Sequence, residues 1–185
     1  MRVISGYLGG RTLVAPRGSD TRPTGDRVRE SLFAILGDLV LDANVLDLFA
    51  GSGSLGIEAI SRGAKSCIFV DKDRVPVEVI RKNVSTLELE GVTSVISMDA
   101  IKALTLLSGK EEFDLVFADP PYKAELHDKV IETIVDLNLL KKSGILVLEY
   151  SAHNRPSESV GGLLRVREAK YGETLVGFYS YRVCS

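Results

Sequence analysis

The sequence predicts an α/β fold with a mostly parallel, seven-stranded sheet that ends in an antiparallel hairpin. Three observations support this prediction. From residue 45 onward, short apolar runs alternate with helical stretches, as in parallel strands joined by right-handed crossover helices. A glycine-rich turn follows the first apolar run. Near the end, two strand-like runs (163–171 and 174–182) are so close in the sequence that only an antiparallel turn can join them.

Length and composition favour one domain. The chain has 185 residues, of which 45% are hydrophobic, enough for a substantial core. We expect a single domain over residues 1–185, with an N-terminal hairpin or arm (1–24) and a core (25–185). No apolar run reaches the roughly 18 residues of a membrane span. The first residues lack the apolar segment of a secretory signal, so we expect a cytoplasmic protein with no membrane contact.

The cysteines and histidines give no sign of a metal site. Cys67 and Cys184 lie too far apart to form a CxxC pair, and Cys67 falls in an apolar strand, as a reduced, packed thiol would. No His/Cys/Asp group has the spacing of metal ligands, so we expect no bound metal. His127 and His153 are isolated, and we expect both at the surface.

The first 30 residues are basic, although the whole chain has a net charge of −2. Six arginines and three acidic residues give this stretch a net charge of +3. Strand-forming residues at Val3-Ile4 and Thr12-Leu13-Val14 flank Gly9-Gly10, which predicts a short β-hairpin or an extended arm. The planar guanidinium of arginine suits phosphates and base edges, so this arm is a candidate nucleic-acid contact. A solvated surface hairpin explains the same pattern equally well.

The remaining elements follow in order along the chain. Thr24 suits the N-cap of an amphipathic helix, whose apolar face carries Val28, Leu32, Phe33 and Leu36. We expect strands at 45–49, 67–71, 95–99, 113–118, 145–149, 163–171 and 174–182. We expect the intervening helices to end near residue 62 and to span 73–87, 100–107 and 126–137.

A glycine motif marks a nucleotide site after the first strand. Residues 51–56 read Gly-Ser-Gly-Ser-Leu-Gly, which matches G-x-G-x-x-G between a strand and a helix. The glycines let a ligand approach the backbone, and the helix N-terminus offers unpaired N–H groups. Asp71 ends the second strand, where a carboxylate can accept ribose hydroxyls. This evidence fits a nicotinamide cofactor and other adenosine ligands equally well.

Four acidic residues lie in or just after four successive parallel strands. They are Asp47, Asp71, Asp99 and Asp119. Asp47 falls inside an apolar strand, where an unpaired charge is costly, so a cationic ligand group is its natural partner. It would also repel a pyrophosphate at the same loop. Any single member has a simpler explanation as a helix cap, but the four together favour a positively charged cofactor.

The segment Asp119-Pro120-Pro121-Tyr122 lies at the carboxyl end of a buried strand, where open α/β sheets bind ligands. The two prolines end the strand because they remove backbone donors. A carboxylate and a proline carbonyl there can accept the two hydrogens of an exocyclic amine, while Tyr122 stacks on the ring. This trio predicts chemistry on the amine of a flat heterocycle, although a rigid capped loop is the simpler alternative.

These motifs together resemble a known family. Asp47-Leu-Phe-Ala-Gly-Ser-Gly and Asp119-Pro-Pro-Tyr resemble motifs I and IV of the Rossmann-like class I S-adenosylmethionine-dependent methyltransferases. The stretch Arg22-Pro-Thr-Gly-Asp-Arg-Val-Arg-Glu-Ser-Leu-Phe33 resembles the signature of the ribosomal RNA small subunit methyltransferase D family. Members of that family are similar in length and methylate guanine N2 in 16S ribosomal RNA. The resemblance covers essentially the whole chain.

The resemblance implies S-adenosyl-L-methionine as the methyl donor, with S-adenosyl-L-homocysteine as its product. It implies 16S ribosomal RNA as the partner, which we expect within a small-subunit assembly intermediate. The expected catalytic residues are Asp119, Pro120, Pro121 and Tyr122. The expected cofactor-binding residues are Asp47, Phe49, Ala50, Gly51, Ser52, Gly53, Asp71, Lys72, Met98, Asp99 and Ala100. The expected RNA contacts are Arg11, Arg22, Thr24, Arg27 and Arg29.

Three other functions remain as alternatives. Adenine-N6 methyltransferases acting on DNA share the Asp-Pro-Pro-Tyr motif, but they usually carry a large target-recognition insert. The stretch between Asp71 and Asp119 holds only regular strand and helix. A nicotinamide-dependent oxidoreductase fits the glycine motif. A non-catalytic RNA-binding protein leaves the row of acidic residues unexplained.

Overall fold

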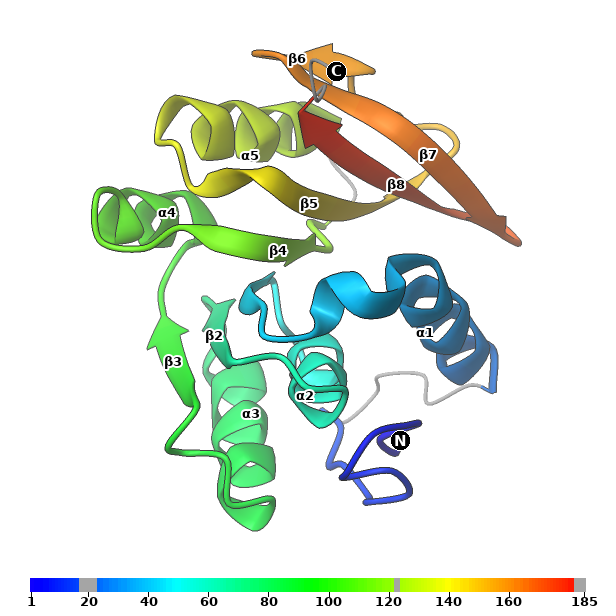
Figure 1. Cartoon of the computed structure of the whole chain (residues 1–185), viewed down its shortest axis with the longest axis vertical. Helices are drawn as coiled ribbons and strands as arrows, with labels where there is room; N and C mark the ends of the chain where they lie inside the picture. Colours follow the sequence, from blue (N-terminus) through cyan, green and yellow to red (C-terminus); the bar gives the residue numbers. More distant parts are fainter. Residues whose placement is uncertain (17–22, 122–123, 182–185) are drawn as a thin grey trace.

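The computed structural model describes residues 1–16, 23–121 and 124–181. They form a three-layer α/β fold around one eight-stranded sheet, in the order β3-β2-β1-β4-β5-β8-β7-β6 (Figure 1). The strands are β1 (Asn44–Leu48), β2 (Ser66–Asp71), β3 (Thr93–Ser97), β4 (Phe113–Ala118), β5 (Leu140–Ser151), β6 (Ser159–Val160), β7 (Leu163–Tyr171) and β8 (Thr174–Tyr181). The helices are α1 (Pro23–Leu36), the 3₁₀ turn η1 (Gly37–Val40), α2 (Ser54–Ser61), α3 (Arg74–Thr86), α4 (Ala100–Leu107) and α5 (Ala124–Asp136).

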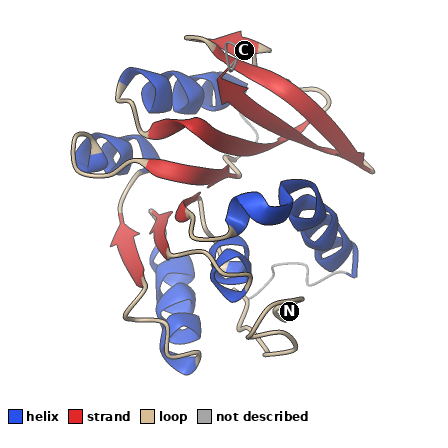
Figure 2. Cartoon of the chain, in the orientation of Figure 1, coloured by secondary structure: helices blue, strands red, loops and turns tan. Residues whose placement is uncertain are grey.

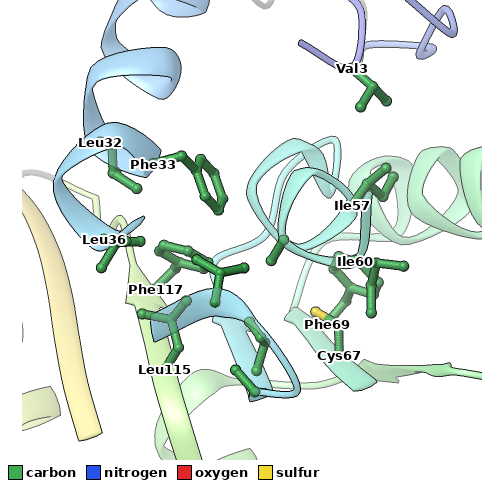
Figure 3. Packing of buried hydrophobic residues seen from close by; sticks show 14 of the residues in the cluster. Val3, Leu32, Phe33, Leu36, Ile57, Ile60, Cys67, Phe69, Leu115 and Phe117 are labelled. Atoms are coloured by element: carbon green, nitrogen blue, oxygen red, sulfur yellow. The ribbon is translucent and has the colours of Figure 1, made fainter. Parts of the chain in front are cut away.

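The sheet is buried on both faces, which explains its nearly continuous apolar strands. One cluster packs α1, α2 and α3 against alternate sheet residues such as Phe69 and Phe117 (Figure 3). The other packs α4 and α5 against the intervening residues, such as Leu46 and Val116. Figure 2 shows how helices and strands alternate along the chain through this core. The five parallel strands therefore end at one common edge of the sheet.

The predicted mostly parallel sheet with an antiparallel end is confirmed. β1 to β5 pair in parallel, whereas β8 pairs antiparallel with β5 and β7. The strand number differs from the expected seven because the two-residue β6 adds to the outer edge. β5 also begins earlier than expected, and its pairing with β4 shifts register between Phe113 and Leu115.

Two local features differ from the sequence-based expectations. α1 begins at Pro23, so Thr24 lies inside the first helical turn rather than capping it. Proline suits this first position because its missing N–H would have no helical partner there. The expectation of two surface histidines was wrong for His127, which is 0% exposed and packs edge-on against the Tyr150 ring. It faces the core because it lies on the inner side of amphipathic α5, whereas His153 is exposed.

The first 16 residues pack against the core. Residues 2 and 12 form a single antiparallel bridge, so the expected hairpin is a loop closed by one bridge rather than two strands. Val3, Leu8 and Leu13 are buried in the core cluster. Asn83 of α3 accepts a hydrogen bond from the N–H of Val14 and donates to its carbonyl.

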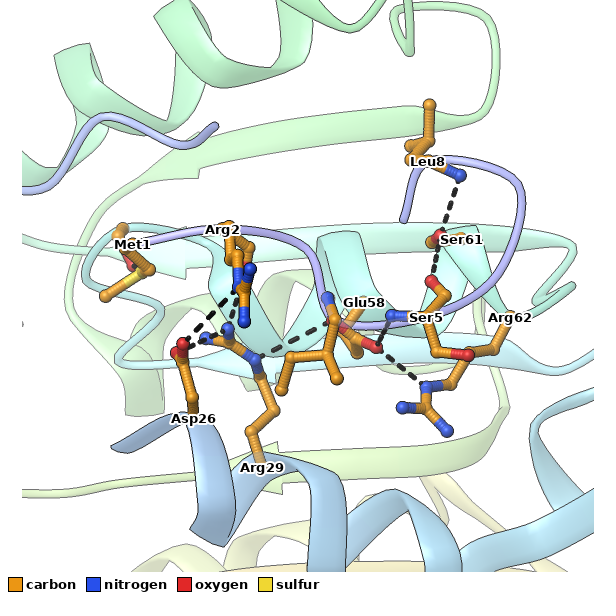
Figure 4. Close-up of polar contacts among 12 residues, drawn as sticks. Met1, Arg2, Ser5, Leu8, Asp26, Arg29, Glu58, Ser61 and Arg62 are labelled. Atoms are coloured by element: carbon orange, nitrogen blue, oxygen red, sulfur yellow. Dashed lines mark hydrogen bonds and ion pairs between the residues drawn. The ribbon is translucent and has the colours of Figure 1, made fainter. Parts of the chain in front are cut away.

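Glu58 of α2 fixes this segment from inside the protein. Its carboxylate is 0% exposed and accepts hydrogen bonds from the backbone N–H groups of Ile4 at 2.7 Å and Ser5 at 3.0 Å (Figure 4). It also accepts one from Arg62 Nε at 2.8 Å and lies 3.7 Å from Arg29 Nε. Both oxygens of this buried carboxyl group therefore have hydrogen-bond donors from the protein.

No helix in the described ranges is long and apolar enough to cross a lipid bilayer.

We expect Glu58→Ala to destabilise the protein by about 3–5 kcal/mol, because it leaves the buried backbone N–H donors unpaired and removes one of the two carboxylates beside Arg29. Urea unfolding followed by circular dichroism measures this change. Glu78→Ala is the matched control, since Glu78 also pairs with an arginine four positions away but at the surface of α3. Equal sensitivity of the two variants would contradict the anchoring role of Glu58.

Candidate functional site

A cavity of about 1070 Å³ lies at the carboxyl ends of the central strands. Asp47 of β1, Asp119 after β4 and Glu149 of β5 all line it, and these three strands are neighbours in the sheet. The β4–β5 register pairs Ala118 with Leu148, so Asp119 and Glu149 are next to each other one position further on. The walls come from the N-terminal segment, α1, the glycine loop and the β7–β8 turn.

The glycine loop turns sharply because three of its residues adopt left-handed backbone conformations. Phe49 has φ of 58°, Gly51 of 58° and Gly53 of 76°. A phenylalanine rarely adopts this conformation, and such strain is concentrated at binding sites. Asp71 fixes the turn, because its Oδ2 accepts a hydrogen bond from Gly51 N–H at 3.0 Å and its Oδ1 accepts one from Asp73 N–H.

The third glycine of the motif has a packing role. A Cβ atom at Gly56 would lie 2.4 Å from the Phe69 ring and 2.5 Å from the Cys67 sulfur. Glycine at this position therefore lets α2 approach β2. The close approach also brings the Gly56 N–H within 2.9 Å of Asp47 Oδ2.

The carboxyl group of Asp47 lies in a place where its ionisation is unfavourable. Its side chain is 3% exposed, and among the described residues Gly56 N–H is its only hydrogen-bond donor. Burial raises the pKa of Asp47 to about 8; the Gly56 N–H opposes this rise, and the negative charges of Asp119 and Asp71 add to it. A cationic ligand group beside Asp47 would favour its ionised form.

Asp119 and Glu149 are two neighbouring carboxyl groups whose pKa values are also raised. Asp119 is open to the cavity, but the protein around its carboxyl group removes enough water to raise the pKa to about 6. Burial raises the pKa of Glu149 to about 7, and the charge of Asp119 contributes to this rise. Within the described part of the chain, neither carboxyl group has a hydrogen bond or an ion pair. The pair therefore offers acceptor oxygens to a ligand.

A small apolar slot of about 60 Å³ adjoins the glycine loop. Phe49 lines both this slot and the large cavity. Asp99 lies at the slot and caps α4, because its Oδ1 accepts from the N–H groups of Ile101 and Lys102. The other residues that line the slot are Val70, Asp71, Lys72, Met98, Ala100, Ile101, Pro121 and Leu126.

The structure brings most of the predicted cofactor residues together. Those that line the large cavity are Asp47, Phe49, Ala50, Gly51 and Ser52. Those that line the slot are Phe49, Asp71, Lys72, Met98, Asp99 and Ala100. Gly53 lines neither; it precedes α2 and donates its N–H to the Ala50 carbonyl.

The predicted catalytic and RNA-binding residues do not gather at one place, and some lie outside the described residues. Pro120 is buried behind Asp119, and Pro121 lies at the slot. Tyr122 and Arg22 lie outside the described residues, as does the side chain of Thr24. Arg11 and Arg27 are exposed.

Arg29 is placed inside the protein rather than at its surface. It is 5% exposed, and its guanidinium contacts Glu58, Asp26 and the Arg2 carbonyl (Figure 4). Burial lowers its pKa, and the nearby carboxylates oppose that change. We therefore assign Arg29 to the structural network around Glu58.

Sequence reasoning missed Glu149 as a site residue. The signal was present, because Glu149 is the single charged residue in the apolar run from Ile145 to Tyr150. Tyr171 and Thr174, which line the cavity from the β7–β8 turn, carry no sequence signal of this kind. Their placement depends on the antiparallel pairing of β8 with β5.

The described residues contain no group of three or more His, Cys, Asp or Glu side chains arranged to hold a metal ion.

Comparisons with known proteins agree on one family. Residues 1–180 match the family model described as conserved hypothetical protein 95. YlbH of Bacillus subtilis, provisionally named an rRNA methyltransferase, is 42% identical over 98% of this chain and 100% of its own length. The ribosomal RNA small subunit methyltransferase D of Escherichia coli K12 is 36% identical, over 83% of this chain and 76% of its own length.

Solved structures agree with the fold. A protein from Escherichia coli, provisionally named methyltransferase yhhF, superposes with a TM-score of 0.88 and 33% identity over 98% of both chains. A Haemophilus influenzae protein named as a methylase, HI0767, superposes with a TM-score of 0.82 and 30% identity over 97% of both chains.

We expect Asp47→Asn to stabilise the ligand-free protein at high pH. The folded-state pKa of Asp47 lies above its ordinary value, so its contribution to stability is fully present below about pH 4 and is lost as the pH rises through about 8. Asparagine keeps an oxygen for Gly56 N–H and removes the buried charge. The Tm should therefore rise at pH 8.5, with a free-energy gain on the order of 1–3 kcal/mol, and change little at pH 4.

Thermal unfolding at the two pH values measures this difference. Asp114→Asn is the control, because Asp114 is partly exposed and accepts hydrogen bonds from Lys141 Nζ. If the Tm of Asp47→Asn at pH 8.5 is equal to or lower than that of wild type, ionised Asp47 does not destabilise the folded protein.

Proposed function

The chain belongs to the conserved hypothetical protein 95 family and to the family of ribosomal RNA small subunit methyltransferase D, and on that premise we propose that it methylates guanine N2 in 16S ribosomal RNA. It is an S-adenosylmethionine-dependent ribosomal RNA methyltransferase. The observation that supports the proposed reaction is the row of carboxyl groups at the strand ends, with Asp119 in the middle.

The residues present fit the methyl donor. Asp47 is a buried, strained acid that suits the α-ammonium group. Asp71, at the end of β2, suits the ribose hydroxyls. The apolar slot with Asp99 at its side suits adenine, because a carboxylate there can accept from the adenine amine. When bound, the donor supplies a methyl group on a positively charged sulfur.

Asp119 and Pro120 prepare the acceptor amine. The guanine amine is a weak nucleophile because its lone pair is delocalised into the ring. Two acceptors, the Asp119 carboxylate and the Pro120 carbonyl, would hold its two hydrogens and fix the direction of attack. A carboxylate also stabilises the positive charge that builds on the nitrogen as the N–C bond forms. The amine then loses one proton, which Asp119 or solvent accepts.

The substrate must present its base outside a helical stack, because the reacting nitrogen is otherwise paired. We propose that a folded RNA within a small-subunit assembly intermediate, in the cytoplasm, does so. Arg11 and Arg27 are exposed and would contact its phosphates. The stacking role of Tyr122 stays a prediction.

The direct test of the reaction is nucleoside analysis of small-subunit particles after methyl transfer from labelled S-adenosylmethionine. We expect N2-methylguanosine. Methyl label on adenine N6 would contradict the proposal and support the other class of amine methyltransferase.

Asp119→Ala should lower methyl transfer by at least about 100-fold, because it removes an oriented acceptor from the reacting amine. Binding of S-adenosylhomocysteine, measured by calorimetry, should stay within a few-fold of wild type. Asp114→Ala, which changes an aspartate at the start of β4 and so at the edge of the sheet opposite the cavity, serves as the control. Unchanged turnover in Asp119→Ala would remove this residue from the reaction.

Arg11→Gln and Arg27→Gln should weaken RNA binding and flatten its salt dependence. Each lost phosphate contact should reduce the slope of log K against log salt concentration by about 0.7–0.9. Lys65→Gln is the matched control, since Lys65 is exposed at the opposite end of the sheet, before β2. Slopes that match wild type in both arginine variants would show that these residues do not contact the RNA.

A further inference from the structure

The large cavity extends beyond the part that the donor needs. Asp47 and the glycine loop lie on the β1 side of Asp119, whereas Glu149 lies on the β5 side. The cavity is also lined by Val28 and Leu32 of α1 and by Tyr171 and Thr174 at the β7–β8 turn, and Thr174 begins the strand that pairs with β5. The Tyr171 hydroxyl lies 2.6 Å from Ser31 Oγ, which joins the turn to α1.

Besides Asp47 and Asp119, two acidic residues of the described chain line the cavity: Asp26 of α1, which pairs with Arg2 and Arg29, and Glu149. Its backbone pairs with Val176 of β8, which is 1% exposed and offers no counter-charge. Within the described ranges its carboxyl group has no hydrogen bond or ion pair. A half-buried carboxyl group that faces the cavity without a protein partner is free to accept a hydrogen bond from a ligand.

We propose that Glu149 selects guanine by accepting a hydrogen bond from its N1–H, next to the amine held by Asp119. This inference rests on the proposed function. In guanine, N1–H is adjacent to the N2 amine, so both donors lie on one edge of the ring. Neighbouring strands are about 4.8 Å apart, which lets two side chains from them approach adjacent atoms of one ring edge.

The proposal explains how the lining of this cavity can discriminate between bases. A purine with an unprotonated N1 presents a lone pair there, and an ionised Glu149 would repel it. Val28, Leu32 and Tyr171 provide apolar and aromatic surface for the flat ring. Sites that satisfy a buried acceptor with one substrate donor reject analogues lacking that donor strongly.

2-Aminopurine provides the test, because it keeps the 2-amino group but has no N1–H. Small-subunit particles are reconstituted with RNA that carries guanosine or 2-aminopurine riboside at the nucleotide that the wild-type enzyme methylates. We expect wild type to prefer guanosine by about 100-fold in kcat/KM. In Glu149→Gln the preference should fall to within a few-fold, because the amide can either accept from N1–H or donate to N1. The intrinsic reactivity of each amine is common to all variants, so the change in preference reports on residue 149.

Two further variants separate charge from structure. Glu149→Asp keeps the repulsive carboxylate and should keep the preference while turnover falls. Glu173→Gln makes the same chemical change at an exposed position of the β7–β8 turn and should behave as wild type. Binding of S-adenosylhomocysteine should change less than twofold in Glu149→Gln, which also shows that the variant is folded.

An unchanged preference in Glu149→Gln, with N2-methylguanosine still formed, would overturn the role of Glu149 and leave the proposed function standing. An unchanged preference with tenfold weaker S-adenosylhomocysteine binding would overturn it too, by assigning Glu149 to the donor site. Absence of N2-methylguanosine from the wild-type product would instead refute the proposed function, and the inference with it.

Discussion

The structure depends on carboxyl groups placed where a folded protein would ordinarily avoid them. Asp47 is buried in the first strand with a single backbone donor, and Asp119 and Glu149 are neighbours at the ends of the next two strands. Burial raises the pKa of all three. Such groups destabilise the protein in the absence of ligands, and the cationic and N–H donor groups that we propose as their partners would offset that cost.

The rest of the fold supports this arrangement. Gly56 lets α2 approach the sheet and bring an N–H to Asp47, while Asp71 fixes the turn that carries the strained Phe49. By contrast, Glu58 is an acid whose donors all come from the protein, and it holds the N-terminal segment as a wall of the cavity. The acidic residues thus fall into two kinds: Glu58 stabilises the fold, whereas we propose that Asp47, Asp119 and Glu149 bind ligands.

Much of this fold was predictable because local patterns determine it. The strand–helix alternation, the glycine turn and the placement of Asp47, Asp71 and Asp119 at one sheet edge follow from periodicity and from the parallel topology. One error arose where a tertiary contact decides: His127, expected at the surface, is buried against Tyr150. Arg29, an expected RNA contact, is buried against Glu58 and also lines the cavity. Glu149 carried a sequence signal as the single charged residue of the apolar run from Ile145 to Tyr150, but its position beside Asp119 follows only from the β4–β5 register.

The central claim is that a positively charged ligand stabilises the ionised form of the carboxyl groups whose pKa values burial has raised. Proton release on ligand binding tests this claim most directly. Calorimetric titration at pH 7 in two buffers of different ionisation enthalpy gives the number of protons exchanged. A cationic ligand lowers the pKa of nearby carboxyl groups, so S-adenosylmethionine should release protons, and it should release more than S-adenosylhomocysteine, which lacks the charged sulfur. No net release with either ligand would contradict the account.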